Sequence, residues 1–158
     1  VVCVAAGGGA DGGHSAAVTA DGRVFTWGCD RWQQLGLGSP AAGAVGYTWA
    51  DGGKVWRRTP RQARLPDGVA AAQVACGDDH TVALGKDGRS VYTWGRGEHG
   101  QLGRDQALFV GAPARSSALS APPGAERIAR VAAAGNCSAT FREDGSLVAR
   151  VGKCAAVM

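Results

Sequence analysis

The stretch VACGDDHTVALGKDGRSVYTWGRGEHGQLG, from Val74 to Gly103, decides the fold. It contains a short apolar run from Thr81 to Leu84, a polar turn at Asp87-Gly88, and a second run of β-branched and aromatic residues from Val91 to Trp94. Residues of these types suit a pleated, half-buried strand, and a glycine in the turn can adopt a positive φ. The stretch therefore predicts a β-hairpin followed by a glycine-rich loop.

Two further copies of this pattern flank the central stretch. In the first copy the matching positions are His14, Asp21, Gly22, Trp27, Gly28 and Gln34-Leu35-Gly36. The third copy keeps its turn at Asp144-Gly145, but Cys137 stands where the histidine is expected and Val151 where the tryptophan is expected. The Asp-Gly pairs recur at intervals of 66 and 57 residues. This spacing is too long for one hairpin and fits one propeller blade with a long loop.

The central copy resembles the regulator of chromosome condensation repeat family. The blades of that family carry Cys-Gly, His-Thr, Asp-Gly, Trp-Gly and Gln-Leu-Gly in this order. The second copy matches every element, at Cys76, Gly77, His80, Thr81, Asp87, Gly88, Trp94, Gly95, Gln101, Leu102 and Gly103. The first copy lacks the Cys-Gly pair, and the third is degenerate. The resemblance implies an all-β fold, a partial β-propeller of about three blades with four-stranded antiparallel sheets that belongs to a larger, seven-bladed ring.

We expect a single partial propeller domain over residues 1–158, with repeats at about 1–66 and 67–123 and an incomplete repeat at 124–158. Propellers close with about four to eight blades, so these repeats cannot close a ring alone. The chain is either part of a larger propeller or a few blades completed by another component, and the sequence leaves both alternatives open. Either way we expect the open ends to be covered, since unpaired edges promote aggregation.

Composition favours a soluble, intracellular, loop-rich β domain. The chain has 26 glycines, 45% hydrophobic and 19% charged residues, and no apolar stretch approaches the length of a membrane span. The Ala-rich runs at 69–74 and 128–134 each lead into a copy of the hairpin, so we assign them to inner strands. The five cysteines are an odd number at irregular spacing, which predicts buried free thiols rather than a disulfide framework or a zinc site.

No motif indicates catalysis, and we expect no enzyme activity, metal or cofactor. His14 and His80 occupy the same place in two repeats, as an architectural role requires and a single active site does not. His99 lies in a glycine-rich loop without a neighbouring nucleophile at a catalytic spacing. The Gly-x-Gly patterns lack the strand-to-helix setting of a phosphate-binding loop.

An insertion near residues 41–54 separates the first two copies and is absent between the second and third. It is followed by KVWRRTPRQAR, from Lys54 to Arg64, which holds five basic residues. One interpretation is a solvated loop whose charges keep the surface soluble. The alternative is a contact surface, because tryptophan, tyrosine and arginine are enriched at binding hot spots. The candidate partner-binding residues are Tyr47, Trp49, Trp56, Arg57 and Arg58.

The preferred function is a non-catalytic protein interaction or structural module, a subunit or fragment of a larger assembly. Resemblance to the family favours this class, since its blades recur in scaffolds and in accessory domains of ubiquitin ligases. The alternative is a guanine-nucleotide exchange factor for a small GTPase; such members act through a full ring with a wedge from one blade, and no wedge is identifiable in the sequence. The net charge of +4 and pI near 9.0 admit nucleic acid as a less favoured partner.

Overall fold

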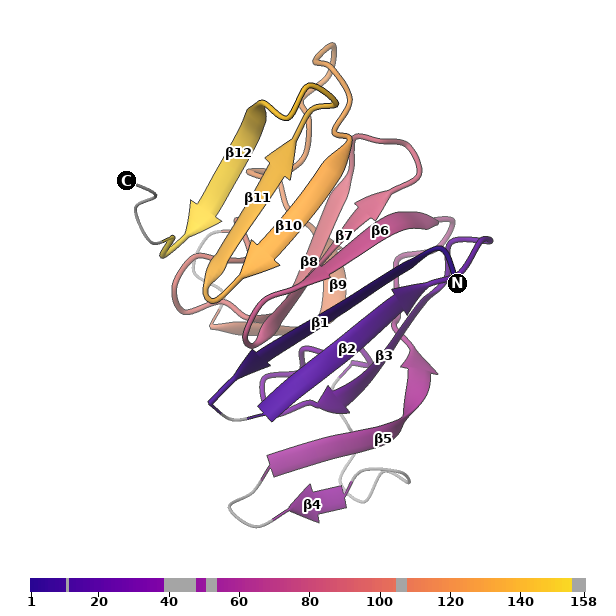
Figure 1. The fold of residues 1–158 in the computed structure, drawn as a ribbon, viewed down its shortest axis with the longest axis vertical. Coiled ribbons are helices and arrows are strands. Elements are labelled where there is room, and N and C mark those ends of the chain that lie inside the picture. The colour runs from indigo at the N-terminus through magenta and orange to yellow at the C-terminus, as the bar shows by residue number, and fades with distance from the viewer. Residues whose placement is uncertain (11, 39–47, 51–53, 105–107, 155–158) are drawn as a thin grey trace.

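The computed structural model describes residues 1–10, 12–38, 48–50, 54–104 and 108–154, which form twelve strands and no helix (Figure 1). The strands make three antiparallel sheets. Sheet A has the order β1-β2-β3-β5-β4, sheet B the order β6-β7-β8-β9, and sheet C the order β10-β11-β12. The all-β partial propeller predicted from the sequence is confirmed. No helix with the length and apolar character needed to cross a membrane occurs in the described residues.

Each sheet is built from strands that follow one another in the sequence. Sheet A comprises β1 (Cys3–Gly9), β2 (Gly12–Val18), β3 (Val24–Cys29), β4 (Thr48–Ala50) and β5 (Lys54–Gln62). Sheet B comprises β6 (Ala71–Cys76), β7 (His80–Gly85), β8 (Val91–Arg96) and β9 (Phe109–Arg115). Sheet C comprises β10 (Arg130–Ala134), β11 (Cys137–Phe141) and β12 (Leu147–Gly152). The hairpins β2–β3, β7–β8 and β11–β12 are equivalent to one another, and the Ala-rich runs form the inner strands β6 and β10.

The three sheets fan out from their first strands. Strand β6 packs against β1 on one side and β10 on the other, and Figure 1 shows these three strands next to one another with the remaining strands of each sheet leading away from them. Small residues dominate this region, as in the CVAAGGG of β1 and the RVAAA of β10. Small side chains allow three sheets to approach one another at a common centre.

Two apolar cores lie between the sheets. Sheet B contributes to both, because alternate side chains along its strands point to opposite faces. The cross-strand row Val74, Ala83 and Tyr92 packs with Ala16, Val18 and Val24 of sheet A. Neighbouring residues of the same strands face the other way. There Val82, Leu84 and Val91 pack with Val131 of sheet C and with the linker residues Leu119, Ala121 and Ile128.

The expectation of five free thiols is wrong. Cys137 and Cys154 form a disulfide with a Cα–Cα distance of 4.8 Å. The reason is the sheet register, because β11 and β12 place Cys137 opposite Gly152, only two residues before Cys154. Cys3, Cys29 and Cys76 are outside any disulfide, and Cys29 and Cys76 are buried as predicted.

The glycine of each Trp-Gly pair is required by close backbone approach. Gly95 has a φ of 99°, and a Cβ there would lie 2.5 Å from the carbonyl oxygen of Asp79. Gly28 has a φ of 105°, and its Cβ would lie 2.6 Å from the carbonyl oxygen of Gly13. The third strand of each blade thus crosses the start of the second strand at a separation that only glycine allows.

Gly95→Ala should therefore destabilise the fold far more than Gly68→Ala. Both positions have positive φ, which costs an alanine about 1 kcal/mol, but no atom lies within 4 Å of a Cβ at Gly68. We expect a loss of about 1 kcal/mol at position 68 and about 3 kcal/mol at position 95, where overpacking adds to the backbone cost. Chemical denaturation measures both. Equal losses would contradict the role assigned to the close approach.

Candidate interaction surface

A three-part hydrogen-bond link joins each sheet to the next. The Nε2 of His14 lies 2.8 Å from Oγ1 of Thr81, and that hydroxyl donates to the carbonyl oxygen of Gln34 over 2.8 Å. A hydroxyl has a single proton, so the histidine must donate from Nε2. His80, Ser138 and Gln101 repeat this arrangement between sheets B and C, with both distances again 2.8 Å.

Burial fixes both histidines in the neutral form. It lowers the pKa of His14 to about 4, and it lowers the pKa of His80 to about 4 with a smaller contribution from the nearby His14. Each Nδ1 is buried without a hydrogen-bond partner in the part of the chain that the structure describes. Protonation would place an N–H at each of these positions, so a charged imidazole is unfavourable.

The tryptophan of the central repeat closes the same junction. Trp94 is fully buried, and a Cβ at Gly36 would lie 2.7 Å from its Nε1. The indole therefore lies against the Gln34-Leu35-Gly36 loop of sheet A. Trp27, the equivalent residue of sheet A, has no such loop over it among the described residues and is only half-buried.

The outward face of sheet A repeats the chemistry of the packed face of sheet B. By register, Val4, Ala17 and Phe25 form one cross-strand row, at the places that Val74, Ala83 and Tyr92 hold in sheet B. Val4 is 71% exposed, Ala17 is buried, and Phe25 is half-buried with the guanidinium of Arg23 over its ring. This is a face with the side chains of a blade-to-blade contact and no blade on it within the described structure.

The insertion adds a hairpin to the outer edge of sheet A. Strand β4 pairs with the first part of β5, and the later part of β5 pairs with β3, so the sheet gains a fifth strand that sheet B does not have. The hairpin lies at the lower end of Figure 1, beyond the body of the sheet. It is specific to one repeat, whereas the other strands recur.

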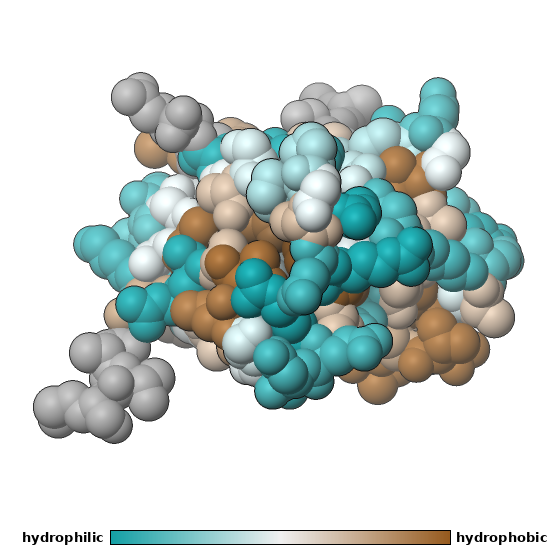
Figure 2. All heavy atoms as spheres, turned by 90° about the horizontal axis from the view of Figure 1, so that it is seen from above, coloured by the Kyte–Doolittle hydropathy of each residue, from teal (hydrophilic) through white to brown (hydrophobic). Residues whose placement is uncertain are grey.

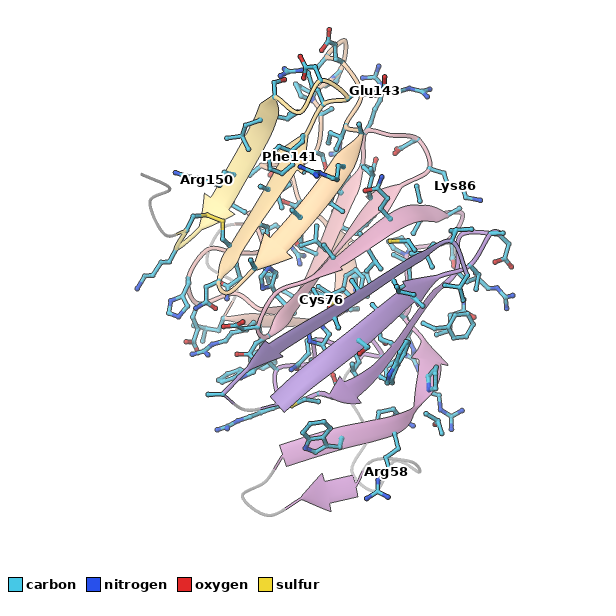
Figure 3. All side chains as sticks on the ribbon, in the orientation of Figure 1. Arg58, Cys76, Lys86, Phe141, Glu143 and Arg150 are labelled. Atoms are coloured by element: carbon cyan, nitrogen blue, oxygen red, sulfur yellow. A yellow bond between two sulfur atoms is a disulfide. The ribbon has the colours of Figure 1, made fainter. Side chains whose placement is uncertain are left out.

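The five candidate partner-binding residues fall in and beside this hairpin. Tyr47 lies outside the described residues, as does the side chain of Trp49, whose backbone is in β4. Trp56 is half-buried, and a Cβ at Gly12 would lie 2.7 Å from its Cη2 atom. Arg57 is only 8% exposed, which leaves little of its guanidinium for a partner. Arg58 is exposed and extends from β5 in Figure 3.

A second cluster at the same end of the sheets was missed by sequence reasoning. The guanidinium of Arg96 lies 4.4 Å from the ring centre of Trp32, and that of Arg31 lies 5.6 Å from it. Arg96 also forms ion pairs with Glu98 at 2.7 Å and Asp79 at 3.4 Å. The cluster joins the loop after β3 to the end of β8. The available signal was Trp32 itself, an aromatic residue in a loop where the second copy has His99.

The loop that carries Trp32 is pinned to the next sheet. Gln33 has a φ of 60°, which is uncommon for any residue but glycine, and the second copy has Gly100 at this place. Its side chain lies against Gly111 of β9, and the N–H of Gly38 donates to the Gly111 carbonyl over 2.9 Å. The loop therefore presents Trp32 from a fixed position between sheets A and B.

Comparison with known proteins identifies the repeat. The model of the Regulator of chromosome condensation (RCC1) repeat matches residues 21–84 and 87–141, and a second model of that repeat matches residues 71–101. The chain belongs to this family. The resemblance predicted from the sequence is thus confirmed.

Similar proteins in this family are considerably longer. The Ultraviolet-B receptor UVR8 of Arabidopsis thaliana is 33% identical over 68% of this chain and 21% of the receptor. The human Regulator of chromosome condensation is 40% identical over 61% of this chain and 20% of that protein. The human probable E3 ubiquitin-protein ligase HERC6 is 35% identical over 77% of this chain and 10% of the ligase. This chain therefore spans a fifth or less of the length of two of these relatives and 21% of the third.

Solved structures agree on the fold. Human WBSCR16 superposes with a TM-score of 0.63 and 26% identity over 85% of this chain and 30% of that chain. Prp20p of Saccharomyces cerevisiae superposes with a TM-score of 0.60 over 85% of this chain and 30% of that chain; at 23% identity this likeness concerns the fold alone.

Stability should fall as pH decreases from about 6.5 to about 4. In this window the unfolded histidines bind protons and the buried ones do not, so the unfolded state gains protons and stability rises with pH. Each histidine should lower the free energy of unfolding by about 2 kcal/mol at pH 5 relative to neutral pH, at 1.36 kcal/mol per pKa unit. Chemical denaturation at several pH values measures the slope.

The control is the single variant His80→Asn, which should be less stable at neutral pH but show about half the slope between pH 6.5 and 5. Carboxylates act in a lower window. For example, the backbone N–H of Ser146 helps to lower the pKa of Asp144, so its effect appears only below about pH 4. A flat profile between pH 6.5 and 5 would exclude the neutral histidine links.

Proposed function

We propose that this chain is a non-catalytic protein-interaction module within a larger propeller assembly. The observation that carries the proposal is the β4–β5 hairpin, which belongs to one repeat only and extends the outer edge of sheet A beyond the four strands of sheet B. Rigid scaffolds carry their specificity in such added segments. Several of the repeated residues, in contrast, are buried, among them His14, His80 and Trp94.

The partner surface comprises the hairpin and the Trp32 loop. Both lie where β3 ends and β5 begins, because Cys29 and Trp56 are register partners at that end. Arg58 offers an exposed guanidinium, and Trp32 offers a ring whose contacts with Arg96 and Arg31 hold it in place. Aromatic area beside arginine suits a protein surface that carries carboxylates.

The outward face of sheet A supports the assembly part of the proposal. Its row of Val4, Ala17 and Phe25 has the chemistry of the sheet B face that packs on sheet A, so it suits a further blade. A partly exposed apolar sheet face favours aggregation when nothing covers it. We therefore expect this face to be covered by another repeat in the working assembly.

Nucleotide exchange on a small GTPase is a second candidate. The specific observation in its favour is the same hairpin, which was not identifiable as a wedge in the sequence and could insert beside a bound protein. Prp20p is a protein whose binding to Gsp1p and histones has been characterised. Release of a fluorescent guanine nucleotide from purified small GTPases separates the two candidates, because an interaction module binds without accelerating release.

The decisive variants are Trp49→Ala combined with Arg58→Ala, compared with Trp94→Ala. The first pair should weaken binding of a purified partner about 30-fold, the effect of losing a hot spot worth about 2 kcal/mol, and leave thermal stability nearly unchanged. Trp94→Ala should lower stability by about 3 kcal/mol or more because the indole is fully buried. Calorimetric titration and thermal denaturation measure the two effects.

The matched control is Arg61→Ala, which removes an exposed arginine from the other end of β5. It should leave affinity for the partner unchanged. If the hairpin variants bind as well as the parent protein, the hairpin is a solvent-exposed segment without a role in binding, and the contact surface lies elsewhere. Binding of duplex DNA by the parent and loss of it in Arg61→Ala would instead favour a charge-driven nucleic-acid contact.

A further inference from the structure

Sheet C uses the repeated histidine position in a different way from sheets A and B. Cys137 in β11 occupies the position that His14 occupies in β2 and His80 in β7. Each of these histidines contacts a hydroxyl of the next sheet. Cys137 is instead bonded to Cys154, which follows β12. A covalent bond thus replaces the outgoing hydrogen-bond link at this end of the structure, and Figure 3 shows the two joined sulfur atoms at the end of β12.

The disulfide borders a surface hollow that a small molecule can enter. The hollow has a volume of about 440 Å³ and is lined by the β10–β11 turn at residues 134–136, by both half-cystines, and by Arg150 and Lys153. Both half-cystines are partly exposed. Figure 2 looks down on the opposite end of sheet C, where hydrophilic residues surround a group of apolar residues.

Two cations border this hollow, and one of them, Arg150, is specific to sheet C. Arg150 pairs with Ala139 at the place where Thr93 pairs with Val82 in sheet B, and Thr93 is completely buried. Arg150 and Lys153 are exposed, and neither forms an ion pair with any residue that the structure describes. Positive charge beside a sulfur attracts anions and stabilises a thiolate.

We propose that the Cys137–Cys154 disulfide is a thiol-exchange site for small anionic thiols. The incoming thiolate attacks Sγ of Cys154, which follows the last strand of the sheet, whereas Cys137 is held between β10 and β12. A new sulfur–sulfur bond forms to Cys154, the Cys137–Cys154 bond breaks, and Cys137 leaves as a thiolate near Arg150. A second thiolate then attacks the small-molecule sulfur of the mixed disulfide, the bond from that sulfur to Sγ of Cys154 breaks, and Cys154 leaves as a thiolate. The protein disulfide gains two electrons, and the two small thiols become one small disulfide.

Two of the three remaining cysteines do not compete in this exchange, and the third, Cys3, is partly buried in sheet A with its thiol 3.6 Å from the carbonyl oxygen of Val74. Cys29 and Cys76 are buried, and burial raises the pKa of Cys76 to about 12, so it stays a neutral thiol. The reactive form in exchange is the thiolate. Cys137 and Cys154 are the cysteines that border the hollow.

The test compares three small thiols on the purified, oxidised chain: 2-mercaptoethanesulfonate (anionic), 2-mercaptoethanol (neutral) and cysteamine (cationic). At equal thiolate concentration and low salt, the anionic thiol should open the disulfide on the order of tenfold faster than the cationic one. The preference should shrink at about 0.5 M salt, where screening is strong. Alkylation of freed thiols followed by mass spectrometry gives each rate.

The variants Arg150→Gln and Lys153→Gln should each reduce the preference for the anionic thiol, and Arg61→Gln, which removes an equal charge from sheet A, should not. These substitutions lie on exposed side chains, so folding is preserved and the rates remain measurable. Equal rates for the three thiols, unchanged rates in both variants, or alkylation of both Cys137 and Cys154 in protein purified without reductant would each overturn the proposal.

Discussion

The structure depends on the link from imidazole to hydroxyl to carbonyl that joins one sheet to the next. The histidine lies near the start of the second strand of one sheet, as His14 does in β2. The hydroxyl belongs to the second strand of the next sheet, as Thr81 does in β7, and the carbonyl belongs to the Gln-Leu-Gly loop. The Thr81 hydroxyl donates its proton to the Gln34 carbonyl, so it must accept from Nε2 of His14. A single proton arrangement remains, with His14 neutral and protonated on Nε2. Inside a low-dielectric junction such a chain is strong when complete and costly when broken. It therefore fixes both the spacing and the rotation between blades.

Glycine and tryptophan complete the same junction from two sides. The glycine of Trp-Gly lets the third strand cross the preceding turn, and the tryptophan lies against the glycine of the Gln-Leu-Gly loop. These elements of the repeat thus act on a neighbouring sheet, whereas the aspartate of the Asp-Gly turn acts within its own hairpin. This explains why a single repeat is not a folding unit, since its partners are supplied by the adjacent blades.

Much of this architecture could be predicted because it depends on short-range sequence patterns. Runs such as Thr81 to Leu84 and Val91 to Trp94 are β-formers around an Asp-Gly turn, and hairpins need no distant information. The disulfide could not be predicted. Its two cysteines are 17 residues apart in the sequence, and the register of β11 and β12 brings them together. Sequence reasoning also treated Arg57 and Arg58 alike. Strand alternation separates them, so that Arg57 is buried and Arg58 is exposed.

The contact of Arg96 with Trp32 was out of reach for a different reason. It joins residues of two repeats whose relative position depends on the packed junction, so neither repeat alone contains the signal. The same reasoning separates architecture from specificity in this chain. The repeated histidines and Gln-Leu-Gly loops act inside the junctions, where a substitution affects two blades at once. The hairpin, the Trp32 loop and the cationic hollow lie at edges and ends. Side chains at those edges can change without breaking a junction, and that freedom is what a binding surface requires.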